Sequence, residues 1–161
     1  MPGLTDTELH DFLNEPGHLL RLGTIGTDGL PRVVPIWFLF DENKIWFTPR
    51  ARSAWLEDLR ANPAVCCTID EEGGLLRKLI ARGEAVLEHD LGADDQWRDR
   101  YRTIALRYTP ESFADAYLTD TINEPRALYS VDLANASTAT WRMPGTGEDR
   151  LAVWSKKYYH R

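Results

Sequence analysis

A short loop at residues 49–53 gathers the side chains best suited to binding an anion. It carries Arg50, Arg52 and Ser53 without an acidic residue, and the sequence after it predicts a helix with Trp55 on its apolar face. Ser53 is a good N-cap, free N–H groups at a helix N-terminus favour an anion, and a guanidinium can hold a phosphate through two hydrogen bonds. The loop therefore predicts a phosphate cradle; the alternative is that the two arginines are solvated loop charges.

The elements before this loop indicate strands joined by tight turns. Residues Thr27–Pro31 predict a hairpin turn, because the Asp-Gly pair supplies a residue with positive φ and the proline stops the first strand. A second turn is expected at Asp41–Lys44. Between the turns, Val33–Phe40 is apolar throughout, which is typical of a strand covered on both faces. The strand Ile45–Thr48 then leads into the loop.

The remaining chain predicts further strands and two groups of helices. Thr5 and Glu8 form a capping-box pattern that opens a short N-terminal helix, and Gly83 permits a bulge or a close backbone approach in a later strand. Strands, short turns and peripheral helices together predict a mainly β fold with α additions, in a single domain over residues 1–161. The expected later strands are 64–69, 79–88, 126–133, 137–143 and 151–154.

Residues 93–120 predict a helical insertion. Trp97, Tyr101 and Tyr108 recur on one face of the first helix together with Ile104 and Ala105. The second helix is expected to start with Thr109 as its cap and Pro110 at its first position, with Phe113, Ala116 and Tyr117 as its apolar residues. We interpret the aromatic stripe as core, while Trp97 and Tyr101 remain weak candidates for a substrate site.

The cysteines and histidines give no support for a disulfide or a metal centre. Cys66 and Cys67 are adjacent, so in a strand they point to opposite faces, and we expect both to be small buried hydrophobic residues. The histidines show no spacing typical of metal ligands, so no metal is expected. The four histidines are His10, His18, His89 and His160.

Composition excludes several functional classes. The net charge of −6 argues against a nucleic-acid module, because binding a polyanion depends on clustered cations. No apolar stretch approaches the roughly 20 residues of a membrane span, so no membrane partner is expected. The N-terminal sequence lacks the basic start and apolar region of a signal peptide, and a cytoplasmic location is therefore expected.

The run from the first hairpin to Pro63 resembles the FMN-binding split β-barrel superfamily, the pyridoxamine 5'-phosphate oxidase-like flavin and deazaflavin oxidoreductases. The helical insertion is similar to that of the deazaflavin-related branch, and Thr140-Trp141-Arg142 resembles a tryptophan strand of the family. The matching residues in the run are Leu22, Thr24, Asp28, Gly29, Pro31, Pro35, Trp37, Phe38, Trp46, Phe47, Thr48, Ser53, Leu59, Asn62 and Pro63.

The resemblance implies a split β-barrel of about six antiparallel strands and a flavin cofactor, FMN, along its wall. The region from Val34 to Trp37 would lie near the ring, Thr48 near the ring or ribityl chain, and the residues from Arg50 to Ser53 at the phosphate. It names no catalytic side chain. The expected cofactor-binding residues are Arg32, Val34, Pro35, Ile36, Trp37, Phe47, Thr48, Arg50, Arg52, Ser53, Trp55 and Trp141.

Trp55 departs from the family pattern, which usually has a phosphate-binding lysine at this position. Losing one charge-assisted contact, worth roughly 1.5–3 kcal/mol, would weaken binding about tenfold to a hundredfold. Arg50 and Arg52 are the candidates that could replace the lysine. Trp55 could equally mark a lineage that binds another ligand.

A barrel of this size is too narrow to hold a tricyclic ring inside, so the flavin must bind outside its wall. We therefore expect a homodimer that completes two equivalent cofactor sites and takes a small-molecule substrate. The primary hypothesis is an FMN-dependent oxidoreductase that transfers hydride to or from that substrate. One alternative is a reductase using the 8-hydroxy-5-deazaflavin coenzyme. The other is a non-catalytic dimer that binds a flavin or haem, for which His18 and His89 are the only weak leads as haem ligands.

Overall fold

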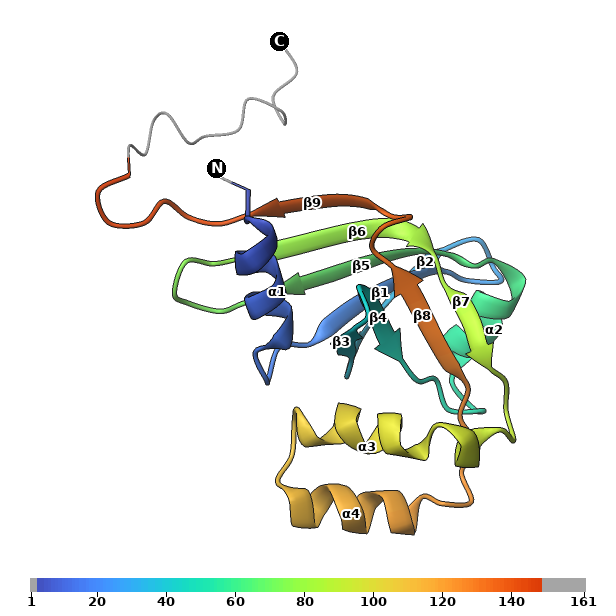
Figure 1. The fold of residues 1–161 in the computed structure, drawn as a ribbon. Coiled ribbons are helices and arrows are strands. Elements are labelled where there is room, and N and C mark those ends of the chain that lie inside the picture. The colour runs from blue at the N-terminus through green and yellow to red at the C-terminus, as the bar shows by residue number, and fades with distance from the viewer. Residues whose placement is uncertain (1–2, 149–161) are drawn as a thin grey trace.

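The computed structural model describes residues 3–148, which form two antiparallel sheets and four α-helices (Figure 1). This confirms the mainly β fold with α additions. The strands are β1 (Leu20–Ile25), β2 (Pro31–Ile36), β3 (Leu39–Asp41), β4 (Lys44–Phe47), β5 (Ala64–Asp70), β6 (Lys78–Glu84), β7 (Val86–His89), β8 (Leu128–Asp132) and β9 (Ser137–Trp141). The helices are α1 (Asp6–Asn14), α2 (Ala54–Ala61), α3 (Arg98–Leu106) and α4 (Glu111–Asp120), with a 3₁₀ turn, η1, at Asp94–Gln96.

The five-stranded sheet has the order β2-β1-β5-β6-β9, and the four-stranded sheet has the order β3-β4-β8-β7. The chain passes from one sheet to the other between β2 and β3, between β4 and β5, between β6 and β7, and between β8 and β9. The main core lies between the sheets and includes Phe12, Leu22, Phe47, Leu79 and Val131. The described residues form nine strands, more than the expected number of about six, and two of the expected strands are each divided between the sheets.

The expected single strand Val33–Phe40 is one of the divided strands. It breaks at Trp37 and Phe38, where the backbone turns from β2 into β3. The Phe38 N–H donates to the Tyr108 hydroxyl at 3.1 Å, and the Trp37 ring stacks on the Tyr108 ring with 5.2 Å between centroids. The hydroxyl thus satisfies a backbone group that a continuous strand would have paired within its ladder. Similarly, the expected strand 79–88 divides at the buried Ala85.

The expected coverage of both faces of β2 is not met within one chain. Val34 and Ile36 pack against the main core, whereas Pro31, Val33 and Pro35 alternate with them on an exposed face. Val33 is 66% exposed. Within one chain, β2 is therefore buried on one face and exposed on the other, although its sequence is mostly apolar.

The local signals at the N-terminal helix and at the first turn are confirmed. Thr5 Oγ1 accepts from the Glu8 N–H at 3.2 Å, and the Glu8 carboxylate accepts from the Thr5 N–H at 2.8 Å, which completes the capping box. Gly29 has a φ of +80° in the turn before β2, a conformation that glycine adopts without steric strain. Gly83 also makes the expected close approach, since a Cβ there would lie 3.3 Å from that of Ala136.

Helices α3 and α4 lie side by side and pack against the four-stranded sheet, away from the main core (Figure 1). Their contact forms a second cluster of buried residues that contains Trp46, Trp97, Tyr101, Ala105, Ala114, Leu118 and Leu128. The apolar face predicted for the first helix is confirmed. This second core fixes the position of the insertion over one end of β4 and β8.

The predicted start of the second helix is wrong by one residue, and of its three expected apolar residues only Tyr117 packs against the second cluster. Pro110 is the N-cap, with φ −59° and ψ 150°, so helical geometry begins only at Glu111. The Thr109 hydroxyl donates to the carbonyl oxygen of Ala105 at 3.0 Å and belongs to the end of α3. Phe113 is 54% exposed and Ala116 is exposed, whereas Ala114 and Leu118 are buried.

The later strands β8 and β9 fall within the expected ranges, and the expected strand 151–154 lies outside the described residues.

Cys67 is fully buried in β5 and Cys66 is half-buried; both are free. Among the described helices, none is long and apolar enough to cross a membrane.

Candidate functional site

A cavity of about 260 Å³ lies where β2, the loop after β4 and the N-terminus of α2 meet the helical insertion. We call it the loop pocket. Its barrel side contains a large part of the predicted cofactor site, and its other side comes from α3, α4 and the segment before β8. The lining residues are Pro35, Ile36, Trp37, Thr48, Arg50, Ser53, Trp55, Tyr101, Ile104, Tyr117 and Arg126.

Ser53 occupies the N-cap of α2, as predicted, but its side chain makes no capping hydrogen bond. Its carbonyl oxygen accepts from the Leu56 N–H at 2.9 Å, which begins the helix. The first N–H groups of a helix have no intrahelical acceptors, and they carry the positive end of the helix dipole. The Ser53 hydroxyl and this helix end together give the loop pocket an anion-binding corner.

Arg126 contributes a buried positive charge that our sequence interpretation missed. It is 6% exposed, and its guanidinium carbon lies 4.4 Å from the centroid of the Tyr101 ring. One guanidinium nitrogen, Nη2, donates to the Tyr117 hydroxyl at 3.1 Å, while Nε is buried without a hydrogen-bond partner. In the sequence, the one feature that could have indicated this role is the position of Arg126 directly before the apolar run that forms β8.

Tyr117 lies between two guanidinium groups. Its hydroxyl accepts hydrogen bonds from Arg50 and from Arg126. Burial opposes ionisation of this phenol, but a hydrogen bond from Tyr101 and the charges of Arg126 and Arg50 outweigh it and lower the pKa of Tyr117. The insertion therefore contributes a polar group, the Tyr117 hydroxyl, to the lining of the loop pocket.

The two loop arginines occupy different places. Arg50 lines the loop pocket and forms an ion pair with Glu124, with 2.9 Å between Nη1 and Oε2. Arg52 is exposed and instead lines a neighbouring cavity of about 410 Å³ with Asn123 and Glu124. The structure thus brings only Arg50 of the two predicted arginines to Ser53 and Thr48.

Several predicted cofactor residues lie away from the loop pocket. Arg32 forms an ion pair with the buried Asp58, and Val34 and Phe47 belong to the main core. Trp141 lies in β9, at the opposite edge of the five-stranded sheet from β2. Within one chain, the structure does not bring these four residues to the pocket.

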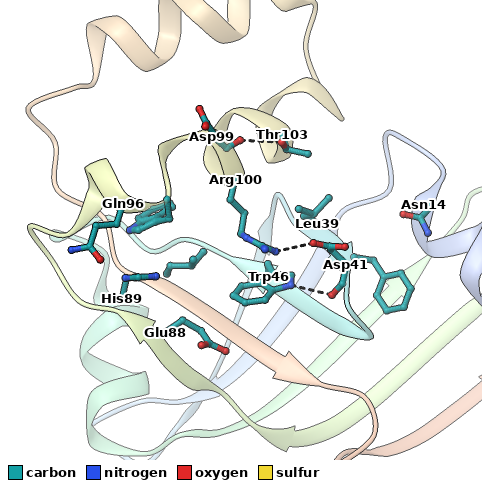
Figure 2. Close-up of a pocket in the computed structure, with 13 residues that line it drawn as sticks. Asn14, Leu39, Asp41, Trp46, Glu88, His89, Gln96, Asp99, Arg100 and Thr103 are labelled. Carbon is teal, nitrogen blue, oxygen red and sulfur yellow. Dashed lines mark hydrogen bonds and ion pairs between the residues drawn. The ribbon is translucent and has the colours of Figure 1, made fainter.

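A larger cavity, of about 730 Å³, lies on the other side of the insertion (Figure 2). Trp97 and His89 line it, together with the carboxylates of Asp41, Glu88 and Asp99. Arg100 points to Asp41, with 3.1 Å between Nη1 and Oδ2, so its charge is already paired (Figure 2). Although it is larger and includes His89, a candidate haem ligand in the alternative hypothesis, this cavity contains none of the residues predicted to bind FMN, and its carboxylates are unsuited to a phosphate.

Glu15, His18 and Glu71 bring three potential metal-ligating atoms within 4.8 Å of one another. Arg77 already occupies this group, since Nη2 lies 2.6 Å from an oxygen of Glu15 and 2.6 Å from an oxygen of Glu71. Hydrogen bonds from Arg77 lower the pKa of both carboxyl groups. The cluster therefore acts as an ion-pair network that joins the end of α1 to the β5–β6 hairpin.

Comparisons with known structures give the same fold. A conserved hypothetical protein from Mycobacterium tuberculosis has a TM-score of 0.68 and 21% identity, covering 96% of this chain and 94% of that chain. An F420 reductase has a TM-score of 0.56 and 23% identity, covering 85% and 98%. HutZ, the heme storage protein of Vibrio cholerae, has a TM-score of 0.62 and 16% identity, covering 86% and 96%.

No curated protein sequence matches the chain. A family model does: that of pyridoxamine 5'-phosphate oxidase matches residues 5–138, which include β2, the loop after β4 and the helical insertion. The match extends over most of the chain and agrees with the split arrangement of the two sheets. The chain therefore belongs to the pyridoxamine 5'-phosphate oxidase family of flavin-binding split barrels.

Proposed function

We propose that this protein is a flavin-dependent oxidoreductase that binds FMN with its phosphate in the loop pocket and transfers hydride to or from a small organic substrate. One observation carries the proposal. The pocket joins the β2 wall at Pro35 and Trp37 to Thr48 and then to Ser53 at the N-terminus of α2. This order of residues is the one expected for ring, ribityl chain and phosphate.

The donor set fits a phosphate monoester. Ser53, Arg50 and Arg126 present a hydroxyl and two guanidinium groups, and α2 adds its N-terminal N–H groups. Glu124 opposes this preference through its ion pair with Arg50, but its side chain is 53% exposed and its charge is screened by solvent. A phosphate could therefore compete with Glu124 for Arg50.

The loop pocket is too small to enclose the whole cofactor, since about 260 Å³ is below the roughly 300–1,000 Å³ that small-molecule sites usually occupy. A tricyclic ring would therefore extend over the β2 face. That face exposes Val33 at 66%, and Leu30 in the turn before β2 is 65% exposed; both are large apolar side chains for a surface. Their exposure supports the homodimer proposal, in which a second chain covers the ring.

When bound, a flavin supplies the hydride chemistry, and the protein binds, orients and tunes it. Trp37 is well placed to support one edge of the site, because it stacks on Tyr108 with an interplanar angle of 2°. Where backbone N–H groups of the barrel wall face the pyrimidine edge of a bound ring, they would stabilise the negative charge of its reduced form. We assign no catalytic side chain.

The proposal is tested by the absorption spectrum of freshly purified protein and by titrating the apo form with FMN and with the 8-hydroxy-5-deazaflavin coenzyme. Saturable FMN binding followed by hydride transfer in stopped-flow traces is the expected result. Binding of the deazaflavin alone would favour the alternative reductase, for which the structural likeness to an F420 reductase is the supporting observation. A ligand that binds without turnover would favour a non-catalytic dimer.

A further inference from the structure

We propose that Arg126 is the main residue that neutralises the phosphate group in the loop pocket. This inference rests on the proposed function, because it assigns a residue to the phosphate end of that site. The ligand class is a phosphate monoester, of which FMN is one member. The assignment rests on the burial of Arg126, on its lack of a carboxylate partner among the described residues, and on its position beside the loop.

Arg126 has no carboxylate partner among the described residues. It is 6% exposed, and its guanidinium contacts two aromatic rings, with the carbon 4.4 Å from the Tyr101 centroid and 5.9 Å from the Tyr117 centroid. Its Nε is buried without an acceptor. A buried charge that lacks a counter-ion is unfavourable, so a bound anion would satisfy both the charge and the free donor.

The backbone of Arg126 is fixed directly beside the phosphate loop. An isolated β-bridge joins Arg126 to Arg50, and the Ala51 N–H donates to the carbonyl oxygen of Pro125 at 2.9 Å. The Ala127 N–H donates to the carbonyl oxygen of Pro49 at 3.1 Å, and the Arg126 N–H donates to Asp94 at 2.8 Å. Folding thus holds Arg126 beside the loop that leads to Ser53, and both residues line the loop pocket although they are distant in sequence.

The two arginines of the loop are less suited to the same role. Arg50 is already paired with Glu124 at 2.9 Å, and Arg52 is exposed and lines a different cavity. Arg126 shares the loop pocket with Ser53 and Thr48. It is therefore the cation there that a phosphate would neutralise without first breaking an ion pair.

The test compares dissociation constants for FMN and riboflavin in wild type, Arg126→Gln and the matched control Arg52→Gln. We expect Arg126→Gln to weaken FMN binding about tenfold to a hundredfold, the range for a lost charge-assisted contact, and to leave riboflavin binding unchanged. Arg52→Gln should change neither. An unchanged preference for FMN over riboflavin in Arg126→Gln would overturn the assignment.

Trp55 provides a rescue experiment, because it lines the same pocket from the first turn of α2. In the Arg126→Gln background, Trp55→Lys places a cation in the pocket again and should restore at least part of the FMN preference. Failure of Trp55→Lys to restore any preference in a folded double variant would count against a simple charge role for Arg126.

A measurement on wild-type protein guards against a folding defect in Arg126→Gln. With arginine labelled by ¹⁵N, FMN should shift the Nε–H resonance of Arg126, assigned through Arg126→Lys, more than riboflavin does. An unchanged Arg126 signal on saturation with FMN would overturn the proposal while leaving flavin binding intact. Conversely, a shift with inorganic phosphate in a protein that binds no flavin would support the phosphate site and reject the proposed function.

Discussion

Arg32 and Asp58 form an ion pair that ties β2 to α2, with 2.7 Å between Nε and Oδ2. The Asp58 side chain is 2% exposed and also accepts from the Thr24 hydroxyl at 2.9 Å. The buried carboxylate therefore accepts hydrogen bonds from both of these side chains through Oδ2. This pair holds β2, the proposed cofactor wall, against α2, which follows the proposed phosphate loop.

Replacing Arg32 should reduce stability without weakening phosphate binding. Arg32→Met leaves the buried carboxylate of Asp58 with only one of these donors, and we expect a loss of about 1–3 kcal/mol in the free energy of unfolding. This is below the range for fully buried pairs because the Arg32 side chain is 40% exposed. Urea unfolding measures the loss. A tenfold loss of FMN affinity at unchanged stability would instead place Arg32 in the cofactor site.

The same pair gives a pH dependence. Burial alone would raise the pKa of Asp58, but hydrogen bonds from Arg32 and Thr24 and the charge of Arg32 outweigh it and lower the pKa. The pair therefore adds stability above the unfolded-state pKa of about 3.9, and this contribution is lost as the pH falls through the lower folded-state value. The stability difference between wild type and Asp58→Asn should be largest near neutral pH and shrink below about pH 4. A difference that stays constant down to the acid transition would contradict this account.

Tyr108 should be essential for the bend between β2 and β3. Its hydroxyl accepts from the Phe38 N–H at 3.1 Å and donates to the carbonyl oxygen of His18 at 2.7 Å. Tyr108→Phe leaves these partly buried backbone groups without this partner, so we expect a loss of about 1–3 kcal/mol in unfolding free energy. Thermal or urea unfolding measures it. A variant as stable as wild type would show that the bend does not depend on this hydroxyl.

The two cysteines should differ in reactivity. Burial raises the pKa of the Cys67 thiol to about 12, whereas Cys66 is half-buried on the other face of β5. A thiol-specific reagent at pH 8 should therefore leave Cys67 unmodified in the native protein and label it only after denaturation. Mass spectrometry of labelled peptides distinguishes the adjacent residues once Cys66→Ser is used as the control. Rapid native labelling of Cys67 would mean that β5 opens readily.

Local sequence signals predicted much of the fold. The capping box at Thr5, the turn at Gly29 and the N-cap position of Ser53 depend on a few neighbouring residues, and all three are present. The divided strands were missed because an apolar run such as Val33–Phe40 does not show where a chain changes sheets. That point is fixed by Tyr108, which lies far along the sequence.

The residues of the candidate site also differ in how far the sequence could predict them. Pro35, Trp37, Thr48 and Ser53 come from one continuous segment, and the structure places them around one pocket. Arg126 is held at that pocket by long-range backbone contacts, including its β-bridge with Arg50, which periodicity and motif spacing do not reveal. Arg52 was included because it is adjacent to Ser53 in sequence, but its side chain is directed to another cavity.

The most direct test of the central claim is the FMN dissociation constant of Ser53→Asp compared with that of wild type. Aspartate is as good an N-cap as serine, so α2 should form normally, while the new negative charge lies where the phosphate would bind. We predict that FMN binding weakens at least about tenfold and that riboflavin binding is unchanged. Equal FMN affinity in the two proteins, or no FMN binding by wild type, would contradict the account of the loop pocket as the phosphate end of a flavin site.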